Sequence, residues 1–217
     1  MTEPRIYPFG DHALVCEAPP PATLACQERI WVLAQAAREW AHVVEVVPGM
    51  NNLTIEFDPL RADLEVLARE LALAWESAVA VASPVREVEI PVRYGGEFGP
   101  DLEAVAVHAG LSVDEVVRRH AGAEYVVFFI GFQPGFAYLG GLDASLHMPR
   151  RSEPRLEVPA GSVGIGGAQT GIYPAASPGG WQLIGRTAAT LFDPARHPPA
   201  LLQPGDRVRF IAAEVTR

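Results

Sequence analysis

The sequence contains no lysine, and all 17 of its basic residues are arginine. No lysine can therefore contact the β- or γ-phosphate of a nucleotide, form a Schiff base, or carry biotin or a lipoyl group. A GC-rich genome that favours arginine codons explains this bias more simply than selection does. Any nucleotide phosphate would have to rest on arginine, on backbone N–H groups, on Mg²⁺ or on a partner protein.

Positive charge, cysteine and long apolar runs are also scarce. The 26 acidic residues outnumber the 17 arginines, and the resulting net charge of −9 argues against a nucleic-acid partner. Cys16 and Cys26 are too few for a disulfide scaffold, and the six histidines have no ligand spacing, so no metal site is expected. No apolar run approaches the ~20 residues that span a bilayer, and the N-terminus lacks a secretory signal. We expect a cytoplasmic protein that binds neither nucleic acid nor membrane.

Residues 1–82 have the pattern of a small α/β domain. Apolar periodicity predicts two helices and three strands, the helices at 23–40 and 64–75 and the strands at 13–17, 43–47 and 52–57. Thr23 is expected to cap the first helix. With one further strand, these elements would form a ferredoxin-like α+β sandwich.

Residues 83–217 have a different texture, and Ser83-Pro84 marks the expected boundary. A strand is predicted at 86–92 and helices at 101–109 and 112–120, with Ser112 and Glu115 forming a capping box. His120 is interpreted as a cap at the end of that helix. No helix is expected after Tyr125. Short apolar runs between Gly and Pro indicate a β-barrel or sandwich, at 126–130, 158, 163–165, 183–184, 191–192 and 208–211.

Aromatic residues interleave with glycine between residues 131 and 186. Glycine lets a backbone approach a ligand closely, and rings supply flat apolar walls. The candidate pocket walls are Phe132, Phe136, Tyr138, Tyr173 and Trp181. The alternative is a tight barrel corner that the same rings pack.

Arginine is concentrated in the same part of the chain. Arg150, Arg151 and Arg155 lie within six residues, and Arg186 follows later. Guanidinium groups bind carboxylate and phosphate bidentately, so these four are candidates for binding a substrate or anion. The alternative is a solvated turn in which the arginines pair with Glu153 and Glu157.

The segment 158–171 is rich in glycine and is interpreted as a polar loop. Gln169 breaks the G-x-G-x-x-G pattern, and Ser162 lacks the strand–turn–helix context of a nucleophile elbow, so neither motif is accepted. Backbone N–H groups of the loop are expected to bind an anion. The polar side chains of Gln169, Thr170, Ser177 and Gln182 are expected to orient a ligand.

Many motifs in one order resemble the family of 5-oxoprolinase B subunits, also called allophanate hydrolase subunit 1. They run through nearly the whole chain. The first are Phe9-Gly-Asp-His-Ala-Leu14, Val46-Val-Pro-Gly49 and Ile90-Pro-Val-Arg-Tyr-Gly-Gly-Glu-Phe-Gly-Pro-Asp101. The others are Gly131-Phe-Gln-Pro-Gly-Phe-Ala-Tyr-Leu-Gly-Gly141, Pro149-Arg-Arg151, Val158-Pro-Ala-Gly-Ser162, Gln169-Thr-Gly-Ile-Tyr-Pro174, Ser177-Pro-Gly-Gly-Trp181 and Pro204-Gly-Asp206. The resemblance implies an N-terminal α/β domain followed by a cyclophilin-like β-barrel, a module related to the carboxyltransferase part of urea carboxylase.

The same resemblance implies one component of a hydrolase that acts on a cyclic amide. Together with homologues of the A and C subunits of 5-oxoprolinase it would open 5-oxo-L-proline to L-glutamate, and it would be inactive alone. The implied cofactor is ATP with Mg²⁺, held by this chain or by its partner. The resemblance assigns no catalytic residue.

Two other functions are weighed against the enzyme. The family includes an inhibitor of a sporulation histidine kinase, so the alternative is a regulatory protein that docks on a sensor kinase through its aromatic loops. A prolyl isomerase would rest on analogy with the cyclophilin-like barrel alone.

Overall fold

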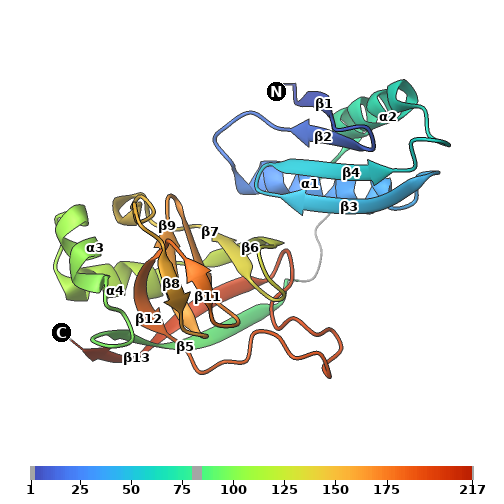
Figure 1. Ribbon diagram of the computed structural model, residues 1–217. Coiled ribbons are helices and arrows are strands. Elements are labelled where there is room, and N and C mark those ends of the chain that lie inside the picture. Colours follow the sequence, from blue (N-terminus) through green and yellow to red (C-terminus); the bar gives the residue numbers. More distant parts are fainter. Residues whose placement is uncertain (1–2, 80–84, 217) are drawn as a thin grey trace. The chain divides into compact units, whose positions relative to one another are not determined.

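A computed structural model describes residues 3–79 and 85–216. The chain divides into two compact units, residues 1–84 and 85–217 (Figure 1). The boundary predicted at Ser83-Pro84 lies outside the described residues. A helix-backed sheet in the first unit and a closed barrel in the second confirm the α+β class.

The first unit is an antiparallel four-stranded sheet with two helices against one face. The strand order is β1-β2-β4-β3, with β1 (Arg5–Phe9), β2 (Ala13–Glu17), β3 (Val43–Gly49) and β4 (Asn52–Phe57). The helices are α1 (Leu24–Ala37) and α2 (Leu64–Ser77). Alternate strand residues such as Leu53, Ile55 and Phe57 are buried against the helices, as their period-two pattern requires.

The further strand of this sheet lies before the first predicted strand rather than after the second helix. β1 forms a hairpin with β2 and occupies one edge of the sheet. Pro8 interrupts its sequence pattern, and proline is tolerated there because an edge strand has one unpaired side. The ferredoxin-like strand arrangement is thus completed from the N-terminal side.

The helix starts follow the predicted caps. The Thr23 hydroxyl accepts a hydrogen bond from Cys26 N at 3.2 Å, and Ser112 accepts one from Glu115 N at 3.2 Å. The Glu115 carboxylate, however, binds Arg118 and Arg119 rather than completing the expected capping box. The first helix ends at Ala37, three residues before its predicted end at residue 40.

The second unit is a closed seven-stranded barrel, as the short apolar runs predicted. Its strand order is β10-β7-β6-β13-β5-β12-β9, with β5 (Glu87–Gly95), β6 (Tyr125–Ile130), β7 (Ala137–Gly140), β9 (Ser162–Gly166), β10 (Gln169–Ile172), β12 (Gln182–Arg186) and β13 (Arg207–Thr216). A separate ribbon pairs β8 (Arg155–Val158) with β11 (Ser177–Gly179). The apolar run 191–192 contributes one isolated bridge, Phe192 to Ala200, and no barrel strand.

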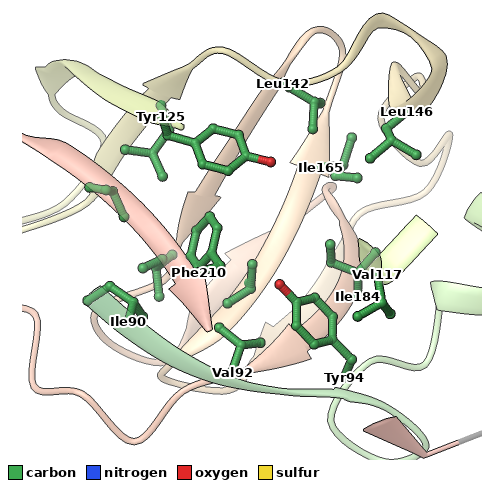
Figure 2. Close-up of a cluster of buried hydrophobic side chains, with 14 of the residues drawn as sticks. Ile90, Val92, Tyr94, Val117, Tyr125, Leu142, Leu146, Ile165, Ile184 and Phe210 are labelled. Atoms are coloured by element: carbon green, nitrogen blue, oxygen red, sulfur yellow. The ribbon is translucent and has the colours of Figure 1, made fainter. Parts of the chain in front are cut away.

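Helices accompany the barrel at α3 (Leu102–Ala109) and α4 (Val113–Gly122). After Tyr125, the described residues contain only one 3₁₀ turn, η1 (Ala144–Leu146), in agreement with the expected lack of helix. Branched and aromatic side chains fill the barrel interior (Figure 2). Figure 2 shows Tyr94 and Tyr125 with their hydroxyl ends turned into this cluster.

His120 corrects one prediction, because it belongs to the barrel core rather than capping a helix end. Its side chain is fully buried and stacks on Phe210 with the ring centroids 4.7 Å apart. Its Nδ1 lies 2.8 Å from the Tyr94 hydroxyl and its Nε2 lies 3.0 Å from Thr170 Oγ1. Burial lowers the pKa of His120 to about 3, so the ring is neutral at physiological pH.

Candidate functional site

Glycines in two barrel strands create a flat outer surface for aromatic side chains. Gly164 and Gly166 alternate along β9 with Val163 and Ile165, which point into the barrel, so both glycines face outward. A Cβ on Gly166 would lie 2.5 Å from Trp181 Cε2, a distance that real side chains do not tolerate. The indole of Trp181 therefore packs directly on the backbone.

Six rings form one continuous network, which we call the aromatic cluster. Its members are Phe129, Phe132, Phe136, Tyr138, Tyr173 and Trp181. Phe136 lies at its centre, with edge contacts to Tyr173 at 5.2 Å and Trp181 at 5.5 Å between centroids. Phe129 stacks on Tyr138 at 4.2 Å. The structure thus brings together all five predicted wall residues.

Burial divides the aromatic cluster into a packed part and an accessible part. Phe136, Tyr173 and Trp181 are 1–4% exposed and therefore serve as packing. Phe132 is 62% exposed, and its φ of 65° is rare for a residue other than glycine. The packed-corner alternative is therefore correct for these three rings, and a role as pocket wall stays a prediction for Phe132 and Tyr138.

The arginine loop, residues 148–152, is fixed at both ends and in the middle. Met148 exchanges two backbone hydrogen bonds with Gly167, at 3.1 and 2.8 Å, and Arg151 N donates to Gly180 O at 2.7 Å. Gln182 Nε2 donates to Pro149 O at 3.0 Å. Four bonds on so short a segment hold the Arg150 backbone in one place.

The carboxylate of Asp101 accepts hydrogen bonds from two arginines and from one backbone N–H of the barrel wall. Its Oδ1 accepts from Arg155 Nη2 at 2.7 Å and from Arg151 Nη1 at 3.4 Å. Its Oδ2 accepts from Leu183 N at 2.6 Å. The predicted alternative, pairing with Glu153 and Glu157, is wrong for the ion pairs of the described residues, because the arginines reach Asp101 instead.

An open hollow of about 360 Å³ lies beside the arginine loop. Its lining residues are His108, Met148, Pro149, Arg150, Arg151, Ser152 and Gln182. Arg150 is exposed, and its Cζ lies 5.8 Å from the centroid of the Trp181 ring, within cation–π range. The hollow therefore adjoins the aromatic cluster at Trp181.

The charge of Arg150 also acts on two phenols of the cluster. Burial raises the pKa of Tyr138 and of Tyr173, and the Arg150 guanidinium opposes that rise in both. For Tyr173, a hydrogen bond to the Trp181 backbone also opposes it. Both hydroxyls stay protonated at neutral pH and keep their hydrogen-bond donors near the arginine.

The other candidate residues have different places. Gln169 has a buried Nε2 without a hydrogen-bond partner, and Ser177 Oγ accepts from Gln133 Nε2 at 3.0 Å. Thr170 is fully buried, and its hydroxyl donates to Gly164 O at 2.9 Å, so it faces the barrel interior. Arg186 lies over the ring of Phe98 with its Cζ 5.6 Å from the centroid and does not line the hollow.

The glycine-rich segment is not the open loop that was predicted. Residues 162–166 and 169–172 form β9 and β10, which pair with each other and with β12 and β7. Nearby N–H groups are also engaged, since Gly161 N donates to Tyr173 O at 2.7 Å and Gly167 N to Met148 O. Backbone pairing leaves these groups unavailable to an anion, and the glycines instead accommodate Trp181.

Sequence reasoning missed Asp101. The residue ends one of the family motifs and begins a predicted helix, but no role was predicted for its side chain, which makes no capping bond. The partners Arg155 and Leu183 lie 54 and 82 residues away, and no local pattern announces such contacts. Its position directly before a helix was the one local signal, and that signal indicated a cap.

No group of three or more His, Cys, Asp or Glu side chains that could hold a metal ion occurs in residues 3–79 and 85–216. Within the same described ranges, no helix has the length and apolarity needed to cross a membrane. The candidate site is the arginine-lined hollow, which adjoins the aromatic cluster at Trp181.

The fold and site define a carboxyltransferase module: the chain belongs to the family "Carboxyltransferase domain, subdomain C and D", whose model matches residues 4–202. The barrel and sheet resemble the corresponding part of the Kluyveromyces lactis urea carboxylase, with a TM-score of 0.83 at 22% identity over 97% of this chain and 22% of that one. That similarity concerns the fold alone.

Within that family the chain groups with the B subunits of 5-oxoprolinase, which confirms the resemblance drawn from the motifs. It is 57% identical to the 5-oxoprolinase B subunit of Escherichia coli O157:H7 over 212 residues, which are 97% of each chain. A solved conserved uncharacterized protein of Pyrococcus horikoshii is 43% identical with a TM-score of 0.59, over 97% of this chain and 98% of that one. The chain also matches a longer solved protein at 39% identity with a TM-score of 0.78, of which it spans 40%.

Proposed function

We propose that this chain is the B subunit of an ATP-dependent 5-oxoprolinase that opens 5-oxo-L-proline to L-glutamate in the cytoplasm. The observation that carries the proposal is the 57% identity to a 5-oxoprolinase B subunit along 97% of both chains. The partners would be homologues of the A and C subunits, and the chain would be inactive without them. The activity is that of a hydrolase acting on a cyclic amide.

The chemistry of the substrate is consistent with the arginine-lined hollow. A lactam amide is resonance-stabilised and resists water, so its hydrolysis needs an activating group and fixed positions for the reacting atoms. The substrate also carries a carboxylate, which guanidinium groups bind well. Arg150 and Arg151 line the hollow and have the charge to position such an acid.

The nucleotide fits the arginine-lined hollow poorly. Mg²⁺ prefers oxygen ligands, usually one or two carboxylates together with substrate phosphates. The lining of the hollow includes no carboxylate, and the described residues hold no group of three or more His, Cys, Asp or Glu side chains that could bind a metal ion. ATP would supply activation of the amide, but no step of that activation is assigned to these residues.

Reconstitution tests the proposal. The chain is mixed with the homologues of the A and C subunits from its own organism, and glutamate release from 5-oxo-L-proline is measured with and without ATP. We expect release only when all three proteins and ATP are present. Release that continues unchanged without this chain would refute the role.

One observation favours the regulatory alternative. Phe132 exposes 62% of its side chain at the edge of the aromatic cluster, and exposed rings are enriched at protein–protein contacts. If the chain docks on a sensor kinase there, Phe132→Ala should weaken both capture of the kinase and inhibition of its autophosphorylation. No binding at micromolar concentration to the histidine kinases of the same organism would exclude this function.

A further inference from the structure

The hollow beside the arginine loop carries positive charge that its surroundings leave unneutralised. Asp101 is shared between Arg151 and Arg155, so one carboxylate faces two guanidinium groups. Arg155, which does not line the hollow itself, has a buried Nη1 without a hydrogen-bond partner. Arg150 makes no ion pair among the described residues, and its guanidinium carbon lies over the Trp181 ring, 5.8 Å from the centroid. In a chain of net charge −9, this local excess attracts an anion.

The hollow is also preorganised. The arginine loop is held by Gly167, Gly180 and Gln182, and Gln182 itself is 7% exposed. The Trp181 ring under Arg150 is 4% exposed and lies against the glycine surface of β9. Binding therefore orders the exposed Arg150 side chain but little of the backbone, and the cost of immobilisation is confined to that side chain.

The chemistry of the lining distinguishes a carboxylate from a nucleotide. A single carboxylate matches one guanidinium fork bidentately, and Ser152 and Gln182 add neutral polar groups at the same hollow. A magnesium-bound triphosphate would require oxygen ligands for the metal, and the described lining has no carboxylate to offer.

We propose that this hollow is a subsite for the carboxylate of a small organic acid, which Arg150 binds beside the Trp181 ring, and that the nucleotide binds elsewhere in the complex. The identity of the acid as 5-oxo-L-proline rests on the proposed function; the carboxylate specificity of the hollow does not. Arg150 is thus a substrate-binding residue, and Asp101 is a positioning residue that orients its neighbours Arg151 and Arg155.

Trp181 provides a direct readout, because it is the one tryptophan of residues 85–217. The full chain is labelled with ¹⁵N, and Trp181→Phe assigns the indole N–H signal. The probes are 5-oxo-L-proline, its primary amide, inorganic phosphate and magnesium-ATP. We expect a saturable shift of the Trp181 indole with the acid, none with the amide, and weaker or no shift with ATP.

Four outcomes of this titration would overturn the proposal. Equal binding of the acid and its amide would show that the carboxylate is not recognised. Stronger binding of magnesium-ATP than of the acid, abolished by Arg150→Gln, would make the hollow a nucleotide site, and the same result with inorganic phosphate would make it a phosphate site. A shift by the acid that survives in Arg150→Gln would place the site elsewhere.

Kinetics of the reconstituted complex provide the second arm. Arg150→Gln should raise KM for 5-oxo-L-proline about ten- to a hundredfold, the range of one lost charge-assisted hydrogen bond, and leave KM for ATP unchanged. Arg150→Lys should recover part of the loss, since it keeps the charge without the fork. Arg118→Gln is the matched control, because Arg118 is an exposed arginine of α4 paired with Glu115.

The two arms separate this inference from the proposed function. Full activity with an unchanged KM in Arg150→Gln, together with no indole shift, overturns the carboxylate subsite and leaves the enzyme role standing. A complex without activity whose chain nevertheless binds the acid and not the amide overturns the enzyme role and supports the subsite.

Discussion

The inner and outer sides of the barrel wall carry similar aromatic and polar residues, but they differ in whether the polar atoms have hydrogen-bond partners. Inside, His120, Tyr94, Tyr125 and Thr170 meet in a core where each ring nitrogen and hydroxyl has a hydrogen-bond partner. Outside, rings of the same kinds lie beside guanidinium groups, and buried nitrogens of Gln169 and Arg155 have no partner.

This difference separates structural polar groups from groups available for binding. The Thr170 hydroxyl donates to Gly164 O, so it accepts from His120 Nε2, and His120 Nδ1 then accepts from Tyr94. In this series of hydrogen bonds every donor and acceptor is paired, so none is available to a ligand. The outer face retains unpaired donors and an unneutralised charge, which is the condition that a binding site requires.

The largest effect is expected from removing the carboxylate on the outer face. Asp101→Ala leaves Arg155 and Leu183 N without their acceptor in a site where the Asp101 side chain is 8% exposed. We expect a loss of about 3–5 kcal/mol in the free energy of unfolding, as for other broken buried ion pairs. Urea denaturation measures it. Asp101→Asn keeps an acceptor and should lose less; an equal loss in both variants would locate the effect in packing.

The inner face should determine the stability of the protein in mild acid. Burial lowers the pKa of His120 from 6.5 to about 3. Between pH 3 and pH 6.5, this histidine is therefore protonated in the unfolded chain and neutral in the folded chain. This contribution is complete above pH 6.5 and is lost as the pH falls toward 3, by roughly 3 kcal/mol at pH 4.

The comparison of wild type with His120→Gln isolates this contribution from other groups. Arg118 and Arg119 lower the pKa of Glu115 to about 2, which adds an acid-dependent loss common to both proteins. Unfolding free energies measured from pH 7 to pH 4 should fall more steeply in the wild type. Parallel curves would contradict a neutral, buried His120.

A smaller effect on stability is expected in β9, which contributes side chains to the barrel interior and glycines to its outer face. Gly166→Ala places a methyl group 2.5 Å from the Trp181 ring and should destabilise the fold by about 1–3 kcal/mol through overpacking. Gly122→Ala is the matched control, because it meets no atom within 4 Å at the end of α4. Thermal unfolding compares the two variants. A Gly166→Ala protein as stable as the control would show that Trp181 moves freely.

The smallest effect concerns the exposed end of the aromatic cluster. Phe132 adopts a φ of 65°, which glycine tolerates and alanine does not. Phe132→Gly should therefore be more stable than Phe132→Ala by about 1 kcal/mol, although both lose the same ring contacts. Equal stabilities in denaturant titrations would argue against strain at this position.

Elements with local signals were predictable from the sequence. β4 has its predicted bounds of 52–57, and α1 and α4 start behind the predicted caps Thr23 and Ser112, because alternation and capping depend on neighbours in the chain. β9 was predicted only as the apolar run 163–165, and β10 was missed as a strand, since glycine at the outward positions removes the alternation that marks a strand. Long-range pairs such as Asp101 and Arg155 escaped prediction because 54 residues separate the partners and no local pattern links them.

The first and last strands of the barrel unit, β5 and β13, lie side by side in parallel and are paired along their whole length. During synthesis, β5 must therefore wait for residues 207–216 to leave the ribosome before its edge is covered. Until then the nascent barrel has two open edges, at β5 and β6, which both pair with β13 in the finished fold. Such non-local pairing is slow to form, so closure of the barrel by β13 is expected to be a late step of folding.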